Sequence, residues 1–122
     1  MVEDRITDGR RIAELLSSEL DGREDGDLAA VAVTNADRDV EPTAEGARAY
    51  DVTCTDERIA RVFIHEDRAR LEFEAGQDVA ADTATDVDLR VRPKATTPPR
   101  TLVFVESGAE VKRATDVVQA VS

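Results

Sequence analysis

The sequence has few aromatic residues, one cysteine and no long apolar run. It contains three Phe, one Tyr and no Trp, so it offers little surface on which bases or rings can stack. Because Cys54 is the only cysteine, an internal disulfide is excluded, which is usual for cytoplasmic proteins. No apolar run approaches the roughly 18 residues of a membrane-spanning helix, and the first residues lack a signal-peptide core. We therefore expect a cytoplasmic protein without a membrane partner.

Common catalytic motifs are also missing. The sequence contains no phosphate-binding P-loop, no Gly-rich dinucleotide motif, no Gly-x-Ser-x-Gly, no His-Glu-x-x-His and no Cys-x-x-Cys. Cys54 and His65 are the only candidates for a Cys/His nucleophilic pair, and the predicted hairpin places them far apart on opposite faces. We expect Cys54 to be buried and inert and His65 to be a solvated turn residue. The sequence predicts no catalytic residue, no metal ligand and no cofactor.

Two acidic clusters, "DGREDGD" (21–27) and "NADRDVE" (35–41), are the only places that suggest a cation site. The second begins with oxygen-bearing residues at alternate positions, as calcium loops do. It then has Val40 where such a loop requires Gly, and Gly46 where it requires a bidentate Glu. We interpret both clusters as solvated surface, and a small metal-dependent hydrolase-like enzyme remains an alternative.

What the sequence has in abundance is charge. Asp and Glu outnumber Lys and Arg, 27 to 16, and the net charge is −11. All the basic residues except Lys94 and Lys112 are Arg. Carboxylates keep a surface hydrated when molar salt shortens the Debye length to about 3 Å, whereas at low salt their repulsion destabilises the compact state. The composition is therefore typical of a halophilic protein whose stability rises with salt.

The first third of the chain predicts one helix and one strand. Leucine and isoleucine recur at helical spacing over residues 7–21, and Thr7 is suited to cap the start of this helix. The run "LAAVAVT" predicts a strand over residues 28–34. Residues 35–46 have turn composition and should be irregular.

Three strands at 47–54, 58–65 and 69–74 then predict an antiparallel meander. Burial of one apolar face fixes the register of the second pair, with Arg61 opposite Glu72 on the other face, where we expect a cross-strand ion pair. The predicted apolar pairs are Ile64 with Ala69, Val62 with Leu71, and Ala60 with Phe73.

The register of the first pair depends on the length of its turn. An even loop places Asp51 beside Val62 on the apolar face, whereas an odd loop pairs Tyr50 with Ile64 and Val52 with Val62. Because a slip of one residue moves every side chain to the other face, burial favours the odd loop.

The rest of the chain predicts an Ala-rich helix over 76–86, strands over 89–92 and 101–106, and a C-terminal helix capped by Ser107. The predicted fold class is α+β. A largely antiparallel sheet of about five or six strands carries the N-terminal and C-terminal helices on one face, in a single domain over 1–122.

The stretch "LRVRPKATTPPRTLVFV" (89–105) contains no acid in an otherwise acidic chain. Arg90 and Arg92 share one face of a strand, while Lys94 and Arg100 flank a Pro-rich loop. Arginines at this spacing suit bidentate binding of phosphate or carboxylate, and proline lowers the entropy lost when the loop is ordered. We predict these four residues as an anion-binding or partner-binding site.

Two alternatives stand beside this prediction. Arg90 and Arg92 can instead pair with acids on a neighbouring strand, such as Glu72 and Glu74. Nucleic acid is a less favoured ligand, because molar salt suppresses counterion release and the stretch has no aromatic platform except Phe104, which we expect to face the core.

Three stretches resemble small proteins of haloarchaea: "VEPTAEGARAYDV" (40–52), "RVFIHEDRARLEF" (61–73) and "RVRPKATTPPRTLVFVESG" (90–108). The resemblance covers nearly the whole chain. It implies an intracellular halophilic domain, and it carries over no activity and no site residues.

The sequence thus favours a non-enzymatic cytoplasmic binding or interaction domain that uses residues 89–105 to meet an anionic group or an acidic partner. A second hypothesis is a structural homodimer, formed through an edge strand or through an outer sheet face carrying Ile59 and Phe63.

Overall fold

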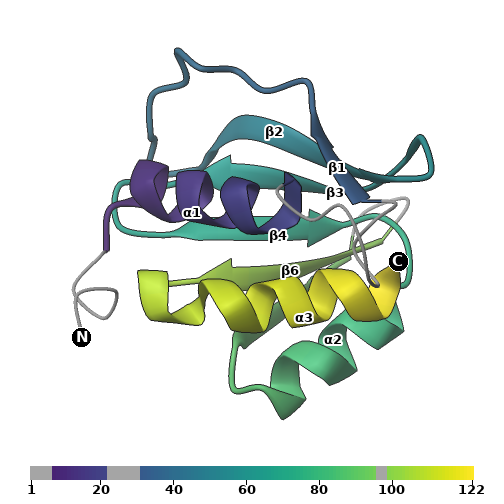
Figure 1. The fold of residues 1–122 in the computed structure, drawn as a ribbon. Coiled ribbons are helices and arrows are strands. Elements are labelled where there is room, and N and C mark those ends of the chain that lie inside the picture. Colours follow the sequence, from purple (N-terminus) through teal and green to yellow (C-terminus); the bar gives the residue numbers. More distant parts are fainter. Residues whose placement is uncertain (1–6, 22–30, 96–98) are drawn as a thin grey trace.

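The computed structural model describes residues 7–21, 31–95 and 99–122. These parts of the chain form a sheet of six antiparallel strands and three α-helices (Figure 1). The elements follow in the order α1 (Gly9–Asp21), β1 (Val31–Thr34), β2 (Ala47–Cys54), β3 (Glu57–Ile64), β4 (Ala69–Phe73), α2 (Gln77–Asp86), β5 (Arg90–Lys94), β6 (Arg100–Val105), the short 3₁₀ turn η3 (Gly108–Glu110) and α3 (Val111–Val121).

The strands lie in the order β1-β2-β3-β4-β6-β5, so β5 and β1 are the two edges. All three helices lie on the same side of the sheet in Figure 1, with α3 between α1 and α2. The predicted α+β class is therefore confirmed, as are the terminal helices on one face and the Ala-rich helix α2. None of the described helices has the length and apolar character needed to cross a bilayer.

The hydrophobic core lies between the sheet and the helices. Ile12, Leu16 and Leu20 form the apolar stripe of α1 and are fully buried, because helical periodicity places them on one face. Phe73 of β4 is the largest fully buried side chain, and most of the other core residues are Val and Ala. Because aromatic residues are few, the core consists of many contacts between small side chains.

Two predicted helix caps differ from those observed. Helix α1 is capped by Asp8 instead of Thr7, because the Asp8 Oδ1 atom accepts the Arg11 N–H at 3.2 Å. Ser107 precedes η3 and its side chain makes no capping hydrogen bond, so α3 begins from a 3₁₀ turn.

The pairing of β3 with β4 agrees with the sequence prediction at every position. Val62 lies opposite Leu71 on the helix-covered face, and Arg61 lies opposite Glu72 on the other face. Burial of a period-two apolar pattern was therefore sufficient to fix this register.

The pairing of β2 with β3 has the predicted faces but a different register. Tyr50 lies opposite Val62 instead of Ile64, which is a shift of two residues. A shift of two leaves both side chains on the same face as predicted, so the apolar pattern does not distinguish the two registers.

The shift arises from the turn and from two bulges. Cys54 pairs with Glu57, so the loop contains only Thr55 and Asp56, both with positive φ (50° and 67°). This loop is even and not odd as predicted, so by itself it would turn Tyr50 and Val52 away from the apolar face of β3. A bulge at Ile59 adds one residue to β3 and returns both side chains to that face. The other irregularity lies between Arg48 and Tyr50 of β2.

Candidate functional site

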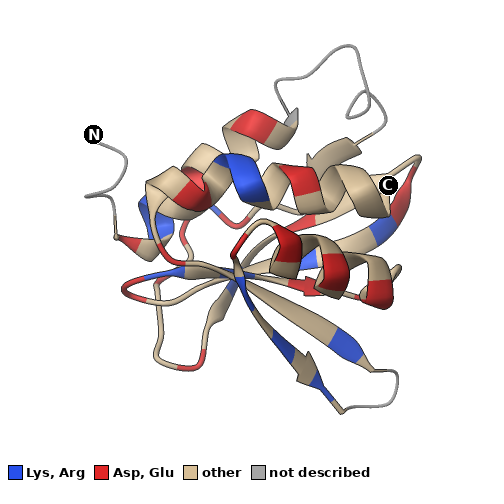
Figure 2. Cartoon of the chain, turned by 90° about the horizontal axis from the view of Figure 1, so that it is seen from below, with Lys and Arg blue, Asp and Glu red and all other residues tan. Residues whose placement is uncertain are grey.

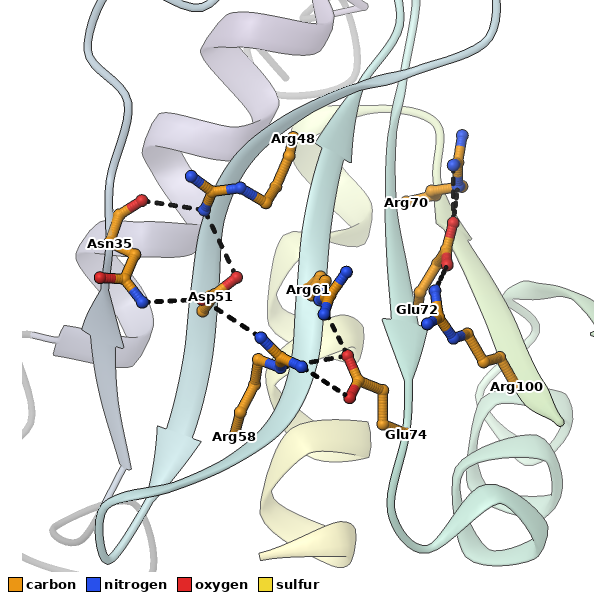
Figure 3. Close-up of polar contacts among 9 residues, drawn as sticks. All are labelled: Asn35, Arg48, Asp51, Arg58, Arg61, Arg70, Glu72, Glu74 and Arg100. Atoms are coloured by element: carbon orange, nitrogen blue, oxygen red, sulfur yellow. Dashed lines mark hydrogen bonds and ion pairs between the residues drawn. The ribbon is translucent and has the colours of Figure 1, made fainter. Parts of the chain in front are cut away.

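The face of the sheet opposite the helices carries most of the polar contacts between strands. Charged side chains from β2, β3, β4 and β6 meet there in two clusters (Figure 3). Counted together with the clusters, this side carries a surplus of basic side chains: Arg48, Arg58, Arg61, Arg70, Arg90, Arg92, Lys94 and Arg100. We call this side of the molecule the open face.

Strand β5 contributes a row of exposed cations to the open face. Arg90, Arg92 and Lys94 occupy alternate positions of β5, and all three are exposed. The strand is longer than the predicted 89–92, so Lys94 lies in it and not in the loop. Alternation therefore brings three of the four predicted residues onto one side of an edge strand, about 7 Å apart along it. We call these three residues the β5 row.

Arg100, the fourth predicted residue, is occupied inside the chain. Its Nη1 atom donates to the Glu72 Oε1 atom at 3.0 Å, and its side chain is 26% exposed. Arg90 makes a looser and more exposed ion pair with Glu106, at 3.5 Å, and its guanidinium lies 5.5 Å from the centre of the Phe104 ring.

Arg92 and Lys94 are the uncommitted members of the predicted site. Among the residues that the structure describes, no hydrogen bond or ion pair reaches either side chain, although the charge of Lys94 acts on Glu72. The structure thus divides the four predicted residues into two with internal partners and two without.

The alternative that Arg90 pairs with an acid of a neighbouring strand is confirmed, because Glu106 directly follows β6, but the acids named as examples, Glu72 and Glu74, are wrong. Strand β6 lies between β4 and β5, so the β5 row and the acids of β4 are not on neighbouring strands. Long-range strand order was not visible in the sequence.

Glu72 is the centre of one cluster on the open face. It is only 1% exposed, and the Arg70 Nε and Nη2 atoms donate to its Oε2 atom at 2.9 and 2.6 Å while Arg100 binds its Oε1 atom. Burial raises the pKa of the Glu72 carboxyl, but the hydrogen bonds from Arg70 and Arg100 and the charges of Arg70 and Lys94 outweigh burial, so the pKa is lowered. Glu72 is therefore a charged group that holds two strands together.

The second cluster joins β2 and β3 to the residues that directly follow β1 and β4 (Figure 3). Asp51 is 4% exposed and accepts hydrogen bonds from the side chains of Asn35 at 2.9 Å and Arg48 at 3.4 Å. Arg61 forms its ion pair with Glu74 at 3.0 Å and not with Glu72, which lies directly opposite it. The predicted partner of Arg61 was therefore wrong although the register was right, because the two Arg residues beside Glu72 already occupy it.

The aromatic rings of the open face are covered by arginine. Arg70 lies 4.4 Å from the centre of the Phe63 ring, and Phe104, which faces this side and not the helix-covered core, lies below Arg68 and Arg90 at 5.7 and 5.5 Å. Such cation–π contacts contribute about 0.5–1 kcal/mol each at exposed sites. They also leave these two rings without a free face on which a base can stack.

The apolar outer pair that motivated the homodimer hypothesis is absent. Ile59 is 7% exposed and belongs to the core, because the β3 bulge turns it inward, and Phe63 is half-buried under Arg70. At the β5 edge, Pro93 lacks the N–H that a strand of another molecule would need. The motive for a dimer through this face is overturned.

His65 and Cys54 lie at opposite ends of the β2–β3 hairpin, as predicted, but their environments differ from those predicted. Cys54 is half-buried beside the turn and packs against the core. His65 is only 5% exposed and makes two hydrogen bonds, so it is not a solvated turn residue. Its partner Ala44 lies 21 residues earlier in the sequence, which is why no local pattern revealed the burial of His65.

A groove that the sequence did not predict runs between α1 and the irregular segment after β1. Its volume is about 600 Å³. Tyr50 lies in its floor, donates its hydroxyl proton to the Ala13 carbonyl at 2.7 Å, and has its pKa raised by burial. The polar side chains around it include both signs of charge: Arg10, Arg38, Glu14 and Asp37.

The acidic clusters of the sequence give no cation site among the described residues. No group of three or more His, Cys, Asp or Glu side chains converges in residues 7–21, 31–95 and 99–122. In the 35–41 segment, Asp37 uses its carboxylate to accept the Asp39 N–H at 3.0 Å. The 21–27 cluster lies outside the described residues apart from Asp21.

The charges of the two sides of the molecule differ. Figure 2 shows several blue bands on the strands below, whereas the helices above carry mostly red bands. Helix α2 carries three exposed acids and no base, namely Asp78, Asp82 and Asp86. An acidic chain thus concentrates its basic residues on the open face of its sheet.

Comparison with known proteins gives a family but no activity. The sequence model of a family of unknown function (DUF7993) matches residues 1–122. No curated protein and no solved structure matches the chain.

Proposed function

Since the chain belongs to DUF7993, a family whose function is unknown, we propose from its own geometry that it is a non-enzymatic binding domain. Its β5 row receives an anionic group of a partner, with Arg92 and Lys94 as the contacting residues. The observation that carries the proposal is a row of exposed cations, two of them without internal partners among the described residues, in a chain of net charge −11.

The chemistry of the row supports carboxylate or phosphate as the bound group. Guanidinium presents a planar pair of donors to either anion, and the ammonium group adds three rotatable donors. Side chains at alternate positions of a strand lie about 7 Å apart, which is also the spacing of alternate side chains in an extended acidic segment. One such segment can therefore contact every member of the row.

An acidic protein segment is favoured over single-stranded nucleic acid. Sequence-tolerant binding of single strands depends on aromatic side chains that stack with bases. On the open face, Phe63 and Phe104 are already covered by arginine side chains. The open face therefore offers a partner electrostatic contacts only, and an acidic peptide can make these contacts.

The test is a binding titration of an oligoglutamate peptide, measured by fluorescence anisotropy at the lowest KCl concentration at which circular dichroism shows the chain to be folded. The double variant Arg92→Ala/Lys94→Ala should bind roughly 3- to 30-fold more weakly, as expected for the loss of two exposed charge pairs. The matched control is Lys112→Ala/Arg113→Ala on α3, which removes the same charges from exposed positions on the other side of the molecule. Equal affinity of the two double variants would reject the β5 row as the binding site.

A second titration separates the classes of partner. A single-stranded oligonucleotide with the same number of negative charges should bind more weakly than the peptide, because it gains no stacking. Tighter binding of the oligonucleotide, lost in the β5 variant, would replace the acidic protein partner with nucleic acid.

A further inference from the structure

His65 lies in a closed environment at the end of β3. Its ring is held between the Ala44 carbonyl oxygen, 3.0 Å from Nδ1, and the Arg70 Nη1 atom, 2.8 Å from Nε2. The first partner belongs to the irregular segment before β2 and the second to β4. One imidazole therefore ties that segment to the sheet.

These contacts fix the protonation state of the ring. A guanidinium group only donates, so Nε2 of His65 must accept the hydrogen bond from Arg70. Nδ1 then carries the proton and donates it to the Ala44 carbonyl. The contacts are compatible only with a neutral imidazole, because a second proton on Nε2 would point at the Arg70 N–H.

Arg70 has no room to move away from an added proton. Its Nη1 atom also donates to the Glu45 carbonyl at 2.8 Å, and its other nitrogens bind Glu72. Gly46 packs against the same atom so closely that a Cβ there would lie 2.2 Å from it. Repulsion between His65 and Arg70 must therefore displace residues 44–46 or break the pairing with Glu72.

We infer that His65 is a proton-sensitive latch, which holds residues 44–46 against β4 when neutral and releases them when protonated. The released segment continues into residues 36–40, which form one wall of the groove beside α1. Protonation thus loosens that wall without requiring unfolding of the sheet.

Together, burial and the neighbouring charges also favour the neutral form of the His65 ring. Burial lowers the pKa of His65, the Ala44 carbonyl raises it, Arg68 and Arg70 lower it, and Asp67 raises it, and the result is a lowered pKa. On the α1 side, the turn meets the uncharged Gly9, whose N–H donates to the Glu66 carbonyl at 3.1 Å. Because the folded pKa is below the usual 6.5, the latch is complete above about pH 6.5 and is lost as the pH falls through the folded value.

Nitrogen-15 NMR of the full chain tests the inference, and His65 gives an unambiguous signal because it is the only histidine. We expect the Nδ1–H tautomer at pH 7.5, and a pKa below 6.5 for the ring. The Nε2–H tautomer at pH 7.5, or a pKa at or above 6.5, would overturn the latch.

Amide hydrogen exchange tests the release itself. The Gly46 N–H donates to the Thr43 carbonyl at 3.2 Å, so this amide reports on the opening of the segment. After correction for intrinsic rates, its exchange should be about five- to tenfold faster once His65 is protonated, as expected when local hydrogen bonds are lost. The β2–β3 turn at Thr55 and Asp56 is an internal control that should show no such change.

The variant His65→Gln removes the titrating group and should make exchange of the Gly46 amide independent of pH between about 5 and 7.5. Persistence of the pH dependence in this variant would assign it to carboxylates and reject the latch. The tautomer and pKa of the wild-type ring decide the question even if this variant does not fold.

Discussion

At Glu72 the open face of the sheet buries a side chain as completely as the helix-covered face does, but by different means. Leu71 and Phe73 of β4 are 0% exposed below the helices, while Glu72 between them is 1% exposed on the side that has no helix. What covers Glu72 is a pair of guanidinium groups, and what covers Phe63 and Phe104 is also arginine. Arginine side chains thus cover buried groups on the open face, as the helices cover those on the other face.

The comparison explains how a short chain covers both sides of a sheet. Apolar burial contributes about 25 cal/mol per Å² and is insensitive to charge. The stability of the helix-covered face should therefore depend on the volume of its side chains. Ion pairs and stacked guanidinium groups depend on exact partners, because a buried charge without one is costly. The two faces should therefore respond to different substitutions.

The largest difference should come from two phenylalanines on opposite faces. Phe73→Ala leaves a cavity in the core and should lower the free energy of unfolding by about 3–5 kcal/mol, measured by urea denaturation. Phe63→Ala on the open face should cost about 1–2 kcal/mol, because Phe63 is half-buried and makes one cation–π contact. Equal losses would mean that the open face is packed like the core.

The next effect concerns the buried carboxylate. Glu72→Gln should lower the free energy of unfolding by about 2–3 kcal/mol, since it leaves the guanidinium groups of Arg70 and Arg100 without a charged partner. The more exposed Glu74→Gln should cost about 0.5–1 kcal/mol in the same denaturation experiment.

The loss caused by Glu72→Gln should also depend on pH. Because the folded pKa of Glu72 is below the usual 4.5, its contribution is complete above about pH 4.5 and disappears as the pH falls through the folded value. The wild type and the variant should therefore converge in stability in acid. A constant difference down to pH 3 would show that packing, and not charge, makes Glu72 important.

Salt should act oppositely on the two sides. It screens the repulsion among exposed acids such as those of α2, and it screens the exposed ion pairs of the open face. With a net charge of −11, relief of repulsion should dominate, so the thermal midpoint should rise as KCl increases from about 0.1 to about 2 M. A falling midpoint would contradict the expectation of a halophilic protein.

The last effect concerns the β2–β3 turn, which both faces share. Thr55 and Asp56 have positive φ, a conformation that Asn and Gly adopt with less strain. Thr55→Asn/Asp56→Gly should raise the free energy of unfolding by about 1 kcal/mol. No gain would indicate that this turn relaxes in solution.

Sequence reasoning succeeded where a single local pattern was sufficient. The stripe of Ile12, Leu16 and Leu20 predicted α1, and apolar alternation predicted every pair between β3 and β4. The parity argument also placed Tyr50 and Val52 on the correct face, although the bulges changed their partners. Periodicity shows on which face of the sheet a side chain lies, but it does not reveal the extra residues that a bulge inserts.

Sequence reasoning failed where the answer depended on contacts between residues that are far apart in the chain. Strand order separated the β5 row from Glu72, and His65 is buried by a segment about 20 residues earlier in the sequence. Asp8 replaced Thr7 as the cap because both are good caps and only the geometry decides between them. Of the predicted site, the facing of Arg90 and Arg92 followed from alternation, but the commitment of Arg100 to Glu72 did not.

The scarcity of lysine has a consequence for covalent regulation. Acetylation neutralises the amine of lysine, and arginine is not a target of that reaction. Lys94 and Lys112 are the only lysines of the chain, and Lys94 lies in the β5 row, so Lys94 is the one residue of the row whose charge an acetyl group can remove. A single acylation would leave the arginines of the open face in place while removing one of its two uncommitted charges.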